Sequence, residues 1–230
     1  EGERIQAVGR AADWAVPPQA QVIDAQGGTI LPGLVNARVH GAYDASVRRH
    51  FLTEGVTAVC DLSAPLSALT VPAQEGPGDA PVARSFYAGP IITAPGGYPA
   101  SDAKRELRYE VADAAEGRAA VQDQVESGVD VVTIALDPGD VEQPLPMLDR
   151  ETVLAVVEEA HAHGLPVRAY VPRAEALEMA LTAGVDVLEP VPMPQEAAAE
   201  LQPAQESAAR HRLPGALEAQ LAQAAAQGVI

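Results

Sequence analysis

From Gly33 onward the sequence alternates short apolar runs, rich in Val and Ile, with stretches rich in Ala and Glu. Apolar runs of this length are typical of strands buried on both faces of a parallel sheet, and the Ala- and Glu-rich stretches favour helices. Strands that alternate with helices along one chain indicate βα units. The pattern therefore predicts an α/β fold built on a parallel sheet, and it constrains the fold more than any single residue does.

Six strands and their helices can be placed to within a few residues. Asp149 is a good helix N-cap, and Gly128, Gly164 and Gly184 mark helix ends. The expected strands are Leu34–Val39, Val56–Asp61, Val82–Ala88, Val131–Leu136, Val167–Val171 and Val185–Leu188. The expected helices are Asp44–Glu54, Glu116–Ser127, Arg150–Ala162, Ala174–Ala183 and an Ala- and Gln-rich stretch over Gln195–Gln227, followed by the start of a seventh strand at Gly228–Ile230.

Six complete units and a stub do not close an eight-stranded (β/α)8 TIM barrel, which takes about 250 residues. We therefore expect an incomplete barrel that is open, truncated or completed elsewhere. An open parallel sheet exposes its edges, and proteins cover such edges with other elements or by association. The sequence thus predicts a protein partner or a homo-oligomer that covers the open barrel edge.

The segment before Gly33 has a different pattern of residues, with short strand-like runs and no helical stretches between them. Arg4–Gly9, Gln21–Asp24 and Thr29–Leu31 are short and strand-like, and Pro17-Pro18 and Gly27-Gly28 separate them as turns. We therefore expect two domains, a small β-element over residues 1–32 and a partial barrel over residues 33–230.

Composition excludes several classes of protein. A net charge of -17 repels nucleic acid and anionic membrane surfaces. No apolar run reaches about 18 residues and Glu1–Arg10 is too polar for a signal peptide, so we expect no membrane segment. The single cysteine, Cys60, excludes an internal disulfide. The chain begins with Glu1 rather than Met, so we expect a processed or trimmed product. The compartment stays open, with the cytoplasm as first choice.

Five segments, in order, resemble the metal-dependent amidohydrolase superfamily, nearest to its imidazolonepropionase-like and prolidase-like members. The first is VIDAQGGTILPGLVNARVH at Val22–His40, which is similar to the segment that opens that fold. The others are LTEGVTAVCDL at Leu52–Leu62, the expected loop GPIITAPGGYP at Gly89–Pro99, SGVDVVTIALDPG at Ser127–Gly139, and Val156–Pro192. The resemblance implies an amidohydrolase-type barrel.

The same resemblance implies where a metal site stands, and the residues there are substituted. The family has two histidines one residue apart after the first strand, where this chain has Arg38 and His40. A bridging lysine, a histidine after the fifth strand and a histidine after the sixth correspond to Thr133, Tyr170 and Pro190. The family's last ligand, an aspartate, falls beyond Ile230. Of the positions that can be aligned, only His40 keeps its ligand.

These substitutions remove electron-pair donors. A guanidinium has no lone pair for a metal and always carries a positive charge. A phenol with a pKa near 10 is a poor ligand at neutral pH, whereas catalytic zinc needs three protein ligands. We therefore expect a degenerate metal site at Arg38, His40, Thr133, Tyr170 and Pro190, with no metal cofactor.

Other candidate residues have simpler interpretations. Asp61 and Asp137 follow strands at the face where barrel sites lie, and we expect them to serve as ion-pair partners for Arg38 rather than in acid–base catalysis. His161 and His163 are two residues apart on a helix, so they do not face each other, and we expect a structural role near the helix C-terminus. Ser46, Ser63 and Ser85 have no evident His and acid partners.

Three functions remain open. The first is a catalytically inactive homologue or structural subunit. The second is a metal-dependent hydrolase of C–N bonds, of cyclic amide or dipeptide type, that uses zinc or another divalent metal with non-standard ligands or a missing C-terminal part. The third is a binding subunit whose Arg38 holds a carboxylate.

Overall fold

The computed structural model describes residues 5–10, 13, 15–69, 81–140, 142–190, 222 and 225–226 of the chain. The chain forms two compact units, Glu1–Pro32 and Gly33–Ile230. Among the described residues, no helix is long and apolar enough to cross a membrane.

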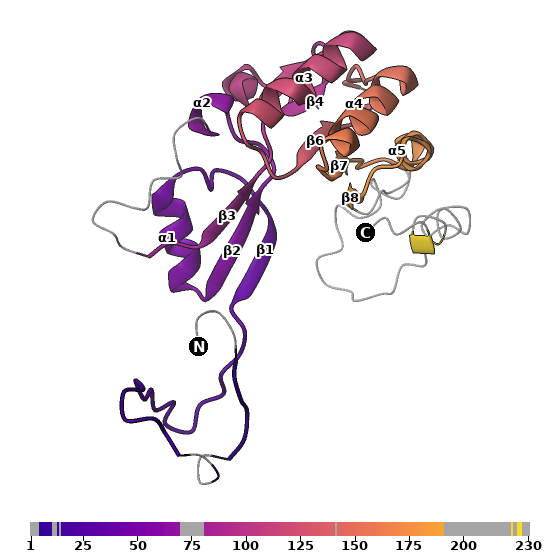
Figure 1. Cartoon of the computed structure of the whole chain (residues 1–230). Helices are drawn as coiled ribbons and strands as arrows, with labels where there is room; N and C mark the ends of the chain where they lie inside the picture. The colour runs from indigo at the N-terminus through magenta and orange to yellow at the C-terminus, as the bar shows by residue number, and fades with distance from the viewer. Residues whose placement is uncertain are drawn as a thin grey trace. The chain divides into compact units, whose positions relative to one another are not determined.

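The described strands of the larger unit form two sheets, and every strand pair in them is parallel. This confirms the α/β class and is compatible with a partial TIM-type barrel. The three-stranded sheet has the order β1 (Leu34–Val39), β2 (Val56–Asp61) and β3 (Arg84–Tyr87). The five-stranded sheet has the order β5 (Arg108–Glu110), β4 (Ile91–Thr93), β6 (Val132–Ala135), β7 (Val167–Tyr170) and β8 (Val187–Glu189). Strands β4, β6, β7 and β8 of this sheet are labelled in Figure 1.

Aspartate caps begin three of the helices. Asp149 begins α4, as predicted, and its carboxylate accepts a hydrogen bond of 2.8 Å from the Thr152 N–H. Asp44 and Asp113 do the same for α1 and α3, since each satisfies N–H groups that lack a partner in the first turn. The helices are α1 (Ala45–Thr53), α2 (Leu66–Leu69), α3 (Ala114–Glu126), α4 (Arg150–Ala162) and α5 (Leu177–Ala183), with 3-10 turns η2 (Asp102–Leu107) and η3 (Ala174–Ala176).

The main core lies between the five-stranded sheet and its helices. Val132 and Ile134 of β6 are fully buried against this core, together with Val153 and Val156 of α4. Burying each such side chain contributes about 1.5–3 kcal/mol. Because side chains alternate along a strand, Thr133 of β6 lies on the opposite face of the sheet, which is the inner face of the partial barrel.

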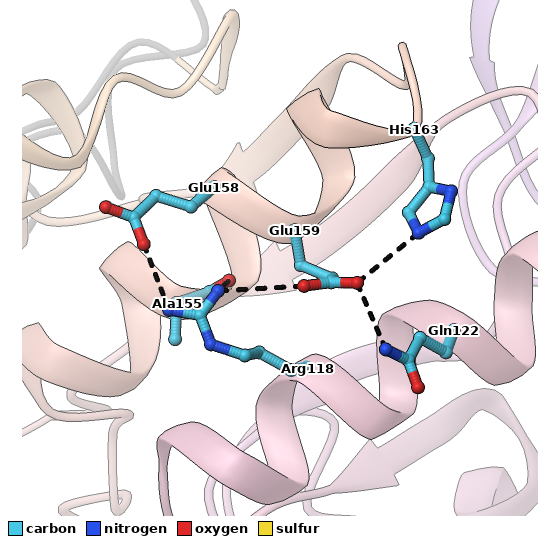
Figure 2. A network of polar contacts seen from close by, with 6 residues as sticks. All are labelled: Arg118, Gln122, Ala155, Glu158, Glu159 and His163. Carbon is cyan, nitrogen blue, oxygen red and sulfur yellow. Dashed lines mark hydrogen bonds and ion pairs between the residues drawn. The ribbon is translucent and has the colours of Figure 1, made fainter.

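Helices α3 and α4 are also joined by a polar network on their exposed side (Figure 2). The guanidinium of Arg118 donates to Glu158 at 3.0 Å and to the Ala155 carbonyl at 3.3 Å. Gln122 donates to Glu159 at 3.1 Å, and this bond is the main reason why the pKa of Glu159 is lowered. Exposed pairs of this kind each contribute less than about 1 kcal/mol, so the buried valines decide the helix packing.

The two sheets meet at a short junction, which we call the seam. It consists of an isolated parallel bridge between Ala88 and Val131 and a reciprocal pair of hydrogen bonds between Tyr87 and Asp130. The Asp130 N–H donates to the Tyr87 carbonyl at 2.8 Å, and the Tyr87 N–H donates to the Asp130 carboxylate at 2.9 Å. The side chain of Asp130 thus completes a link that backbone alone does not make.

The segment Gly89–Pro99, expected as a loop, contains a strand. Ile91, Ile92 and Thr93 form β4, and all three are buried. The Gly89-Pro90 dipeptide separates β4 from β3, since proline has no N–H for a ladder. After Pro90 the chain enters the five-stranded sheet, because the apolar residues Ile91 and Ile92 are buried there and Ile92 pairs with Ile134 of β6. The three-residue strand β5 was also not predicted.

The strands expected between residues 1 and 32 are not formed by the described residues of that unit, which are turns and irregular backbone. Ile5, Val22 and Ile30 remain 85%, 73% and 82% exposed. Alternating apolar residues make a strand only when a neighbouring strand accepts the backbone hydrogen bonds and another layer covers the apolar face. Neither is present for these residues within the described part of the unit.

The helical stretch expected over Gln195–Gln227 lies outside the described residues, except for positions 222 and 225–226, which are helical. The strand expected at Gly228–Ile230 also lies outside them.

Candidate site at the strand ends

A buried ion cluster occupies the inner face of the partial barrel. Val39 packs into the core under α1, so strand alternation turns Arg38 and His40 to the other face. There the Nε of Arg38 lies 3.3 Å from a carboxylate oxygen of Glu189, and Arg168 pairs with the other oxygen of the same carboxylate. Two cations therefore share one anion.

Burial differs sharply within this cluster. The side chains of Glu189 and Arg168 are 9% and 13% exposed, whereas that of Arg38 is 51% exposed. Arg168 also donates a hydrogen bond of 3.7 Å to the sulfur of Cys60, but a thiol sulfur is only a weak acceptor. The Arg168–Glu189 pair is thus the buried part of the cluster, and Arg38 is its solvent-facing part.

The expected pairing of Arg38 with Asp61 or Asp137 is wrong. Glu189 is its partner because Glu189 is the last residue of β8 and stands opposite Tyr170, on the inner face. The Asp61 carboxylate is instead held by backbone, accepting from the Ala42 N–H at 2.6 Å and the Ser63 N–H at 3.2 Å. The Asp137 carboxylate accepts from the Gly139 N–H at 2.9 Å.

A serine and a histidine meet on the three-stranded side, although the sequence showed no partner for Ser63. The Nδ1 of His40 lies 2.9 Å from the hydroxyl of Ser63. Desolvation is the main cause that lowers the pKa of His40; Arg38 and Lys104 lower it further, while Asp61 opposes them. This bond occupies Nδ1 and orients the ring, and Ser63 is buried, with 3% exposure.

Burial also acts on Asp61, which is fully buried. Desolvation raises the pKa of its carboxyl group, and the bonds from Ser63 and Ala42 oppose that rise. Since both oxygens already accept backbone hydrogen bonds, this residue supports the turn after β2 rather than offering a free carboxylate.

Two tyrosines form an aromatic wall beside the ion cluster. The rings of Tyr98 and Tyr170 are stacked, with centroids 4.4 Å apart and an angle of 25° between their planes. Burial, with the neighbouring Tyr98 and Asp137, raises the pKa of Tyr170 to about 12. The wall borders an open cavity of about 510 Å³, which is also lined by Asp137, Leu145, Pro172 and Arg173.

The fold family implies a divalent metal, and the donors present here do not fit one. Arg38 is engaged with Glu189, and Tyr170 is held as a neutral phenol. Thr133 offers a buried hydroxyl with no hydrogen-bond partner among the described residues, and Pro190 offers only a carbonyl. Within the described ranges, no three His, Cys, Asp or Glu side chains gather closely enough to hold an ion.

His161 and His163 lie at the end of α4 and bind separate carboxylates. The Nε2 of His161 is 2.9 Å from Asp186, and that of His163 is 3.3 Å from Glu159, as Figure 2 shows for the second pair. Each imidazole therefore has its own structural partner, outside the strand-end site.

Several site residues were not found from the sequence. Tyr98 lies in the segment Gly89–Pro99 that the family resemblance covers, but the sequence predicted no role for it. The signal for Arg168 and Glu189 was available, since both are charged residues at inward positions of apolar strands, where an isolated charge is costly. Arg173 carried no signal, because its role depends on the loop after β7.

No family model and no curated protein matches this sequence. Solved structures do match its fold. An amidohydrolase has a TM-score of 0.63 at 22% identity over 94% of this chain, and a molinate hydrolase has 0.65 at 23% over 96%. A protein described as a putative prolidase from Bifidobacterium longum has 0.63 at 26% over 80%.

These structures define the class: the chain has the fold of the amidohydrolase superfamily, as the sequence resemblance implied. More particularly, the similar structures include proteins described as prolidases and as a molinate hydrolase. The chain spans 65% of the length of that amidohydrolase, 56% of the molinate hydrolase and 46% of the prolidase.

Proposed function

We propose that this chain is an amidohydrolase-like protein without hydrolase activity, whose strand ends have exchanged a metal site for an internal ion cluster. The observation that carries the proposal is the pairing of Arg38 and Arg168 with Glu189 at the inner face. Two guanidinium groups against one carboxylate leave a net positive charge, and a positive charge repels a divalent cation.

The remaining donors support the same conclusion. Metal-activated water needs a cation held by about three protein ligands with one open position. His40 supplies one nitrogen, and Thr133, Tyr170 and Pro190 supply none that is anionic or basic near neutral pH. Among the described residues, the side chains at the strand ends hold each other and offer no cation site at which a water molecule would be ionised for attack.

Metal content tests this proposal directly. The purified chain, loaded with zinc or manganese and then dialysed, should retain well under one metal per chain by mass spectrometry of the elements. It should also fail to hydrolyse dipeptides and lactams in the presence of either metal. Stoichiometric metal that His40→Ala removes would refute the proposal.

A second candidate is a metal-dependent hydrolase of C–N bonds. It is favoured by the similar folds, several of which are described as hydrolases or prolidases, and by the fixed imidazole of His40. Further ligands would have to come from residues beyond those described. Turnover of a dipeptide or lactam that requires added metal and is lost in His40→Ala would establish it.

We also propose that another polypeptide covers the barrel edge. Among the described strands, β1 and β3 end the three-stranded sheet and β5 and β8 end the five-stranded sheet, so each of these four strands has a single strand neighbour. Sedimentation velocity of the chain should show a dimer or larger species; a monodisperse monomer over micromolar concentrations would contradict this.

A further inference from the structure

We propose that the strand ends bind a small monocarboxylate that carries a planar ring, with its carboxylate on the guanidinium of Arg38 and its ring against Tyr98 and Tyr170. The inference rests on the proposed function, since it needs the positive cluster in place of a metal. The inference goes further than the proposed function, because it names a ligand of defined chemistry for the strand-end site.

The guanidinium of Arg38 is the group that can bind an anion. Its side chain is 51% exposed, and its ion pair with Glu189 is made through Nε. Across the described residues no other side-chain bond of Arg38 is found, so its two terminal nitrogens have no partner among them that a ligand would have to displace. The planar fork of a guanidinium matches the two oxygens of a carboxylate.

The charge of the cluster selects a single negative charge. Arg38 and Arg168 together carry +2, Glu189 carries −1, and the remainder is +1. Lys104 near His40 and Arg173 at the cavity add positive charges, whereas Asp61, Asp137 and Asp140 offset them. A phosphate dianion would face these carboxylates as well as that of Glu189, so like charges disfavour a dianion more than a monoanion.

The cavity supplies room for the rest of the ligand; Arg38 does not line it, but Arg38 is close enough to Tyr170, which does, to act on the pKa of that phenol. Tyr170 belongs to both parts, because it lines the cavity and stands opposite Glu189 in the sheet register. The stacked pair of Tyr98 and Tyr170 offers an aromatic surface, and Leu145 and Pro172 are apolar. About 510 Å³ is ample for one ring, which prefers offset or edge contact with such a wall.

Arg173 is the rival anchor, since it lines the cavity itself. Arg173 is set back in the loop after β7, whereas Arg38 belongs to a strand that is fixed in the sheet and is already oriented by Glu189. A preorganised donor loses less conformational entropy when the ligand binds, so the geometry favours Arg38.

Benzoate is the probe, titrated into the chelator-treated chain by isothermal calorimetry. Benzamide has the same shape without the charge, and inorganic phosphate has charge without the ring; both should bind at least about tenfold more weakly than benzoate. Arg38→Ala should weaken benzoate by a similar factor. Arg150→Ala removes an exposed arginine of α4 that pairs with Glu178 and should leave benzoate binding unchanged.

The possible failures are distinct. Absence of benzoate binding, equal binding of benzamide, or loss of binding in Arg173→Ala but not in Arg38→Ala would each overturn the ligand inference and leave the proposed function standing. Binding that appears only with added zinc and disappears in His40→Ala would instead refute the proposed function, because the carboxylate would then be bound by a metal.

Discussion

Removal of the Glu189 carboxylate is the most direct test of the ion cluster. In Glu189→Ala, Arg168 keeps its charge with a side chain only 13% exposed and loses its carboxylate partner. Breaking a buried pair in this way costs about 3–5 kcal/mol, because the remaining charge is neither solvated nor compensated. That cost is a large part of the unfolding free energy of a typical domain, which is about 5–15 kcal/mol.

The same reasoning predicts a small effect for Arg38. Its side chain is half exposed, so water replaces the lost partner, and Arg38→Ala should cost no more than about 1 kcal/mol. The contrast between the two variants is therefore set by burial rather than by the number of charges removed. It also means that Arg38→Ala can be used in binding experiments as a folded protein.

Urea denaturation followed by far-UV circular dichroism measures the difference. For a slope of about 2 kcal/mol per molar urea, Glu189→Ala should lower the midpoint by about 2 M. The double variant Arg168→Met/Glu189→Leu should recover most of that loss, because an apolar pair of similar volume often equals or exceeds a buried ion pair. A loss below about 1 kcal/mol in Glu189→Ala, or a double variant no more stable than the single one, would refute the reasoning.

Two further predictions concern carboxylates held by backbone. Burial raises the folded-state pKa of Asp61 above its ordinary value of 3.8, so the folded state binds the proton more tightly than the unfolded chain, and stability is lost as the pH rises through the raised pKa. Asp61→Asn cannot ionise; its unfolding free energy relative to wild type should therefore increase as the pH rises from 3.8 upward, and a difference that is flat or falls with pH would contradict this. Asp149→Ala should lower the unfolding free energy by about 1 kcal/mol through loss of the α4 cap, and Asp149→Asn by much less. Because bonding to Thr152 lowers the pKa of Asp149, the loss in Asp149→Ala should shrink as the pH falls below 3.8, in thermal melts at several pH values; equal loss at all pH values would exclude the ionised cap.

The parallel fold was predictable because periodicity and caps are local. The ranges Leu34–Val39, Val56–Asp61 and Arg150–Ala162 agree with β1, β2 and α4, since apolar runs, a glycine end and an aspartate cap all lie within the segment itself. Parallel strands also bring their carboxyl ends to one edge, which is why Arg38 and Asp61 were expected at the same face.

The partners within the site were not predictable. Several carboxylates stand at the same edge, and a long arginine side chain can reach more than one of them. Only the register of β7 with β8 shows that Glu189 faces inward beside Tyr170. The apolar residues of the first unit failed for a similar reason, because a strand is defined by a neighbour that its own sequence does not contain.

The residues of the strand-end site come from both of the sheets that meet at the seam. His40, Ser63 and Asp61 belong to the three-stranded sheet and its loops, whereas Tyr170 and Glu189 belong to the five-stranded sheet. Among the described residues, the two ladders are linked by one backbone bridge, by the Asp130–Tyr87 bonds and by the weak bond from Arg168 to Cys60. The Arg38–Glu189 pair joins β1 to β8, which are not the strands that meet at the seam, so it links the two sheets at another place. A molecule bound by Arg38 and in contact with Tyr170 would add a further link between the two sheets.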